Sequence, residues 1–73
     1  MDIREYFKEA IAEAKKPSKE RGAIIYSCSI PAQRWFGKDG IYRFLTDEYI
    51  DAMPEDELKL KLATFIANCY RQR

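Results

Sequence analysis

Residues 23–45 read AIIYSCSIPAQRWFGKDGIYRFL, and the period of their apolar side chains decides the fold class that the sequence predicts. From Ala23 onward, every second side chain is large and apolar: Ile24, Tyr26, Cys28 and Ile30. The side chains between them are Ile25, Ser27 and Ser29. Such alternation is typical of a half-buried strand, which Pro31 would end. We therefore predict a strand over residues 23–30, with Cys28 as a buried structural thiol.

Two aromatic-rich segments, 33–36 and 41–45, flank Gly37-Lys38-Asp39-Gly40. Glycines and an Asp-Gly pair supply the positive backbone angles of a tight reversal, so these segments predict a β-hairpin. Its register stays open. A two-residue turn places Phe36 opposite Arg43, whereas a four-residue loop places Trp35 opposite Tyr42.

Helical patterns lie on both sides of this region. The apolar residues Ile3, Phe7 and Ile11 share one face and predict a helix over residues 2–16, which Asp2 caps and Pro17 ends. Thr46 can cap a short helix that begins at residue 47, and a last helix is predicted from the acidic stretch 55–57 to residue 70. The stretch between the first helix and the strand, residues 15–22, contains four basic side chains and predicts an exposed basic linker.

Together these elements predict a single α+β domain over residues 1–73, in the order α-β-β-β-α(α). A three-stranded antiparallel sheet over about residues 23–45 would be covered on one face by the N- and C-terminal helices. The expected core is Ile3, Phe7, Ile11, Ile24, Tyr26, Cys28, Ile30, Leu58, Leu62, Phe65, Ile66 and Cys69.

The order of these elements is similar to that of the double-stranded RNA-binding domain. The resemblance implies RNA as a partner, and lysines at the start of the final helix that contact phosphates. The corresponding stretch in this chain, Pro54-Glu55-Asp56-Glu57, is acidic and would repel a nucleic-acid backbone. The resemblance therefore extends to the architecture and not to the binding motif.

The composition narrows the possible functions of this 73-residue chain, which has 13 basic and 12 acidic residues, two cysteines and no histidine. Without histidine there is no Ser-His or Cys-His nucleophile, and two cysteines alone cannot complete an ordinary zinc site. We therefore expect no enzyme activity, no cofactor and no metal. The first residues lack a secretory pattern and no apolar run approaches the ~18 residues of a membrane span, so we expect a cytoplasmic protein without membrane contact.

Two sets of side chains are candidates for partner binding. The first interleaves basic and aromatic residues on the predicted hairpin: Arg34, Trp35, Lys38, Tyr42 and Arg43. Trp, Tyr and Arg dominate protein-binding hot spots, and aromatics beside guanidinium groups also stack nucleic-acid bases. The second set is an acidic block, Asp47, Glu48 and Asp51, within a stretch from 47 to 57 that has six acidic residues and no basic ones. Such a block could present carboxylates to a basic protein groove.

These features predict a small non-enzymatic module that docks on a larger protein and regulates or inhibits it. Small stand-alone proteins of this kind are often encoded by phages or other mobile elements to block host machinery. The alternative is a nucleic-acid-binding module that uses the hairpin and the basic linker, although the net charge of +1 argues against it. A third hypothesis is a homodimer formed through Leu60, Tyr70 or an edge of the hairpin.

Overall fold

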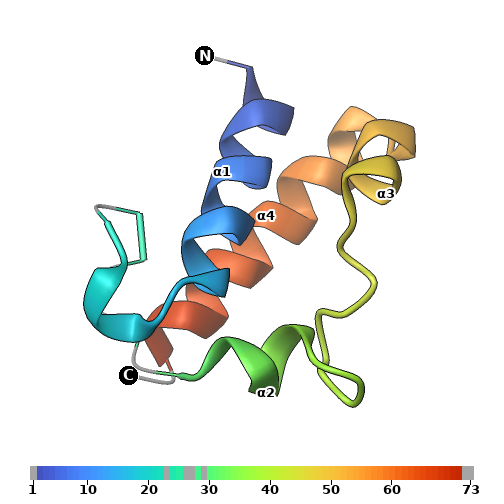
Figure 1. Ribbon diagram of the computed structural model, residues 1–73. Helices are drawn as coiled ribbons and strands as arrows, with labels where there is room; N and C mark the ends of the chain where they lie inside the picture. The colour runs from blue at the N-terminus through green and yellow to red at the C-terminus, as the bar shows by residue number, and fades with distance from the viewer. Residues whose placement is uncertain (1, 23, 26–27, 29, 72–73) are drawn as a thin grey trace.

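The computed structural model describes residues 2–22, 24–25, 28 and 30–71 and places four α-helices in them (Figure 1). The helices are α1 (Ile3–Lys15), α2 (Ala32–Phe36), α3 (Asp47–Ala52) and α4 (Glu55–Arg71), and one 3-10 turn, η1 (Ser18–Glu20), follows α1. No strand forms among the described residues, so the prediction of an α+β fold is wrong. The chain is a small all-α domain, and without a sheet the architectural resemblance to the double-stranded RNA-binding domain is lost.

The predictions for the first and last helices are confirmed, as is the short helix before the last. Asp2 caps α1 by accepting a hydrogen bond at Oδ1 from the Arg4 amide at 2.9 Å, and the helix ends two residues before Pro17. At α3, Thr46 Oγ1 accepts a hydrogen bond from the Tyr49 amide at 3.2 Å. Met53 closes α3 and Pro54 directly precedes α4.

The described residues of the predicted strand 23–30 are not in a strand, because 24 and 25 lie in a turn and 28 and 30 have no regular secondary structure. Ile25, on the face predicted to be polar, is fully buried, and its carbonyl accepts a hydrogen bond from the Cys28 amide at 3.1 Å. Cys28 is buried, as predicted. Predicted core residue Tyr26, together with Ser27 and Ser29, lies outside the described residues.

A charged side chain explains why the carbonyls of Cys28 and Ile30 need no neighbouring strand. The sequence predicts an exposed linker around Arg21, but this side chain is only 6% exposed and donates hydrogen bonds to backbone carbonyls. Two of these acceptors are Cys28 O, at 2.7 Å, and Ile30 O, at 2.5 Å. The guanidinium thus satisfies buried carbonyls that a sheet would otherwise have to pair.

The predicted hairpin is also wrong. Pro31 is the N-cap of the short helix α2, and residues 38–39 and 41–44 form turns, not a second strand. Trp35 O accepts a hydrogen bond from the Tyr42 amide at 2.8 Å, but no strand ladder continues from it among the described residues. Gly40 permits this close approach because a Cβ at its position would collide with Trp35 O. The three glycines all lie among the described residues, and none has the positive φ that the predicted reversal required.

The core is built around Phe65 of α4. Its ring contacts four other aromatic rings, with centroid separations of 5.9 Å to Phe7, 5.8 Å to Trp35, 6.3 Å to Phe36 and 4.9 Å to Tyr42. Seven predicted core residues are buried: Phe7, Ile11, Cys28, Ile30, Leu58, Phe65 and Cys69. Four others are partly buried and pack against the core: Ile3, Ile24, Leu62 and Ile66. The sequence did not predict Ile25, Trp35, Tyr42, Leu45, Ile50 or Met53 as core residues.

Helices α1 and α4 run in the same direction, which segregates charge along the molecule (Figure 1). The start of α1 lies against α3, because Arg4 Nη1 donates to Ile50 O at 2.5 Å and Lys8 pairs with Asp51 at 2.8 Å. One end of the molecule, the acidic end, therefore carries Asp2, Glu5, Asp47, Glu48, Asp51, Glu55, Asp56 and Glu57. The other, the basic end, carries more cations than carboxylates. Its cations are Lys15, Lys16, Lys19, Arg34, Lys38 and Arg43, and its carboxylates are Glu13, which pairs with Lys16 at 2.8 Å, Glu20 and Asp39.

Candidate functional site: a groove between α3 and α4

The two aromatic residues of the predicted hairpin site lie in the interior. Trp35 is 2% exposed and Tyr42 is 9% exposed. The Tyr42 hydroxyl accepts a hydrogen bond from Asn68 Nδ2, and Trp35 packs edge-on against the Tyr42 ring at 6.1 Å. Both side chains therefore serve the core, and neither presents a face on which a base or a partner side chain could stack.

The basic members of that predicted site are on the surface. Arg34, Lys38 and Arg43 are exposed, and Arg43 Nη1 donates to Lys38 O at 2.8 Å. Arg34 also lines a shallow hollow with Asp39 and Ile41. The structure thus leaves these cations exposed, but the two aromatic rings that were predicted to lie beside them, Trp35 and Tyr42, are buried.

The acidic block lies on α3, where its members have different environments. Asp51 forms an ion pair with Lys8 of α1, and its hydrogen bond raises the pKa of the Lys8 ammonium. Asp47 and Glu48 are exposed in the first turn of α3. Asp51 therefore helps to hold α3 on α1, whereas Asp47 and Glu48 remain accessible to a partner.

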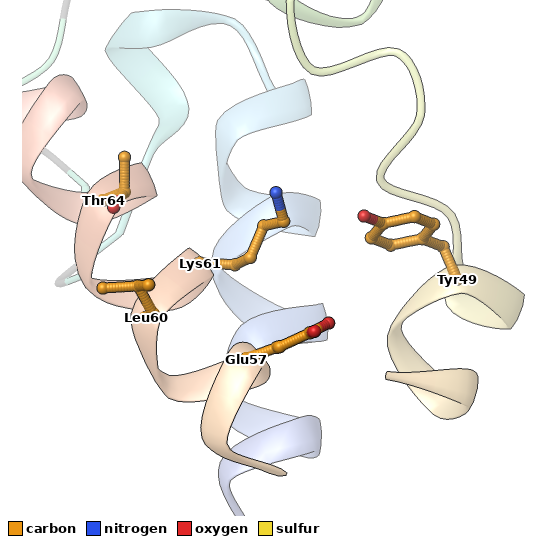
Figure 2. Close-up of a pocket in the computed structure, with 5 residues that line it drawn as sticks. All are labelled: Tyr49, Glu57, Leu60, Lys61 and Thr64. Atoms are coloured by element: carbon orange, nitrogen blue, oxygen red, sulfur yellow. The ribbon is translucent and has the colours of Figure 1, made fainter. Parts of the chain in front are cut away.

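A surface groove that the sequence analysis did not identify lies between α3 and α4. Tyr49 of α3 forms one side, and Glu57, Leu60, Lys61 and Thr64 of α4 line the rest. Figure 2 shows the Tyr49 ring across from Lys61 and Glu57, with Leu60 on the far side of Lys61. A second hollow shares Tyr49 and Glu57 and continues the groove to Ala52, Met53 and Pro54.

Large apolar side chains are exposed around this groove. Leu60 is 70% exposed, Phe44 is 40% exposed and Tyr49 is 38% exposed. Phe44 extends the aromatic side, because its ring meets Tyr49 edge-to-face at 5.3 Å and the Lys61 ammonium lies 5.6 Å from its centroid. We call these six residues the groove face: Phe44, Tyr49, Glu57, Leu60, Lys61 and Thr64.

The exposure of one residue of the groove face could be predicted from the sequence. Leu60 falls between Lys59 and Lys61 and lies off the buried face of α4, so its exposure follows from the helical period. Phe44 and Tyr49 carry no such signal. Their position beside α4 depends on the path of residues 40–46 between α2 and α3 (Figure 1).

The groove face combines exposed aromatic and aliphatic side chains with two charged ones, Glu57 and Lys61. Tyrosine is among the residue types that are enriched at the energetic centres of protein interfaces. The described residues contain no cluster of three or more metal-ligating side chains. Burial, followed by the neighbouring Cys28, raises the pKa of the Cys69 thiol to about 12, so this thiol is protonated and not a nucleophile near neutral pH.

Comparison with protein-family models, with curated proteins and with solved structures returns no match to this chain. Among the described residues, no helix is sufficiently long and apolar to cross a membrane.

Proposed function

We propose that this chain is a small non-enzymatic protein-binding module that docks on a larger protein and regulates it through the groove face. The observation that carries the proposal is the gathering of Phe44, Tyr49 and Leu60 around one groove on the surface of a domain that already has a complete aromatic core. Leu60, at 70% exposed, adds little buried area to the domain's own core, and together with Phe44 and Tyr49 it forms an exposed apolar patch of the kind that marks interaction sites.

The surroundings of the groove favour a protein partner over nucleic acid. Glu57 lines the groove, and the exposed Asp47 and Glu48 lie in the same helix as Tyr49. Carboxylates at these positions would repel phosphates. The basic end retains exposed cations for the alternative function, but Trp35 and Tyr42 no longer provide it with a stacking surface.

Affinity capture with matched variants tests the proposal. The wild-type chain and the variants Tyr49→Ala and Leu60→Asp would be immobilised in parallel, and proteins retained from cell extract would be quantified by mass spectrometry. We expect both variants to lose roughly tenfold or more of one specific wild-type partner, because anchors near the centre of an interface dominate its energy.

Ile41→Ala is the matched control, since Ile41 is 62% exposed but lies outside the groove. It should retain the partner at the wild-type level, and thermal melts should show that all three variants stay folded. A partner that Tyr49→Ala and Leu60→Asp still retain, or no specific partner for the wild type, would rule out the groove face as the docking site for a larger protein.

A further inference from the structure

We infer that the groove face also binds a second copy of this chain, with the two α4 helices antiparallel across a two-fold axis. This inference rests on the proposed function, because it names a partner for the same surface. A larger protein would then compete with self-association for the groove face. Three features of the chain, each present in the monomer, make the face complementary to itself.

The first feature is a projecting side chain beside a hollow. Leu60 stands on the rim of the groove that Tyr49, Lys61 and Thr64 line (Figure 2). In a two-fold interface the same patch meets itself, so a projection on one copy enters the hollow of the other and the contact is made twice. A face that carries both shapes can therefore close into a dimer without any further surface.

The second feature is a pair of opposite charges on the same face. Glu57 and Lys61 are one helical turn apart, but the structure shows no ion pair between them, and Lys61 instead lies over the Phe44 ring. By contrast, Lys59 pairs with Glu55 at 3.7 Å within the same helix. An antiparallel crossing near Leu60 brings Glu57 of each copy within reach of Lys61 of the other, as in the ion pairs between the helices of a coiled coil.

The third feature is the segregation of charge between the acidic end and the basic end. Because α1 and α4 are parallel, antiparallel pairing of α4 sets the acidic end of each molecule beside the basic end of its partner (Figure 1). The same arrangement opposes the macrodipoles of the two α4 helices. The acidic end and the basic end that would meet in this dimer are both present on one chain, which favours a second copy over any other occupant.

Sedimentation equilibrium tests the inference over protein concentrations from about 5 µM to about 1 mM at low salt. The wild-type chain and Ile41→Ala should pass from the monomer mass of 8.6 kDa to twice that mass as concentration rises. Leu60→Asp should remain monomeric over the whole range. Raising the salt concentration should weaken the dimer, because part of its attraction lies between exposed charges.

A charge-reversal experiment then tests the geometry. Glu57→Lys and Lys61→Glu should each be monomeric, since each places like charges opposite one another at both contacts. An equimolar mixture of the two variants should dimerise, because both contacts of the mixed dimer pair opposite charges. At one contact the introduced lysine faces the introduced glutamate, and at the other the unchanged Lys61 faces the unchanged Glu57. Damage to the fold of either variant could not be repaired by mixing.

A monomeric wild type up to about 1 mM would overturn the inference. It would also be overturned by a dimer that survives Leu60→Asp, or by a mixture of the charge-reversal variants that stays monomeric. These outcomes leave the proposed function intact, because its own test depends on capture of a different protein. Conversely, capture that is insensitive to Tyr49→Ala would remove the proposed function and leave the dimer measurement valid.

Discussion

Arg21 is a buried cation that the chain surrounds with carbonyls. Its Nε donates to Lys16 O at 3.2 Å, and its two terminal nitrogens donate to Ala14 O, Cys28 O and Ile30 O. The guanidinium carbon also lies 5.6 Å from the centroid of the Trp35 ring. One planar group thereby joins the end of α1, the carbonyls of Cys28 and Ile30, and Trp35 of α2, which the single ammonium of a lysine could not do in the same geometry.

Replacement of Arg21 should therefore be costly. We expect Arg21→Met to lower the free energy of unfolding by about 3 kcal/mol or more, because it leaves several buried carbonyls without donors. Arg21→Lys should fold with a smaller loss of unfolding free energy, since lysine keeps the positive charge but lacks the planar set of N–H donors of the guanidinium. Urea unfolding measures both, with the exposed Lys19→Ala as a control that should change stability by less than about 0.5 kcal/mol. If Arg21→Lys were as stable as the wild type, the planar arrangement of the guanidinium donors would be unimportant for stability.

The buried thiol of Cys69 should make the stability of the protein depend on pH. Its pKa is raised from 9.0 to about 12, first by burial and then by Cys28. The native state therefore holds this proton at a pH where the unfolded chain releases it, and the free energy of unfolding should fall as pH rises from 9.0 toward 12. Thermal melts across this range should show a weaker pH dependence in Cys69→Ala than in the wild type. If the melting temperature fell equally steeply with pH in both proteins, Cys69 would not be the cause of the pH dependence.

Phe65 shows how much the long helices contribute to the core. It is fully buried and contacts aromatic rings from α1, from α2 and from the turns that follow α2. Phe65→Ala should cost about 3–5 kcal/mol, which such a small domain tolerates poorly. Phe65→Leu should remain folded with a lower melting temperature, whereas the exposed Thr64→Ala should melt like the wild type. An unchanged melt for Phe65→Leu would contradict this packing.

The helices could be predicted from the sequence where they are long or capped. The 13 residues of α1 and the 17 of α4 carry the helical period over several turns, and Thr46 marks the start of α3. Residues 23–45 contain only short apolar runs, in which a period of two is weak evidence. The conformation of this stretch depends on residues that are distant in the sequence. Arg21 donates hydrogen bonds to the carbonyls of Cys28 and Ile30, and Phe65 packs against the buried rings of Trp35 and Tyr42.

The candidate site could be predicted only in part, for the same reason. The exposure of Arg34, Lys38, Arg43, Asp47 and Glu48 follows from a general rule, because charged side chains are costly to bury without partners. Arg21 is the exception, since backbone carbonyls surround it. Which aromatics are exposed depends on tertiary packing, so the sequence predicts Trp35 and Tyr42 at the site, whereas Phe44 and Tyr49 surround the groove instead.

Across the whole molecule, the parallel packing of α1 and α4 gives the two ends opposite charge. Acidic first turns stabilise each helix N-terminus, and parallel alignment places these turns at the same end. The net charge is only +1, yet the two ends have opposite sign. Such a molecule has oriented electrostatic attraction for a partner, or for a second copy, that its composition alone does not reveal.

Hydroxyl-radical footprinting read by mass spectrometry tests this arrangement of buried and exposed aromatics most directly. Phe44, Tyr49 and Leu60 should be oxidised rapidly in the dilute wild-type protein, while Trp35 and Tyr42 should be protected despite their reactive rings. As protein concentration rises, protection should appear at Tyr49 and Leu60 but not at Ile41. Oxidation of Trp35 and Tyr42 as fast as that of Tyr49 would contradict both the fold and the groove face.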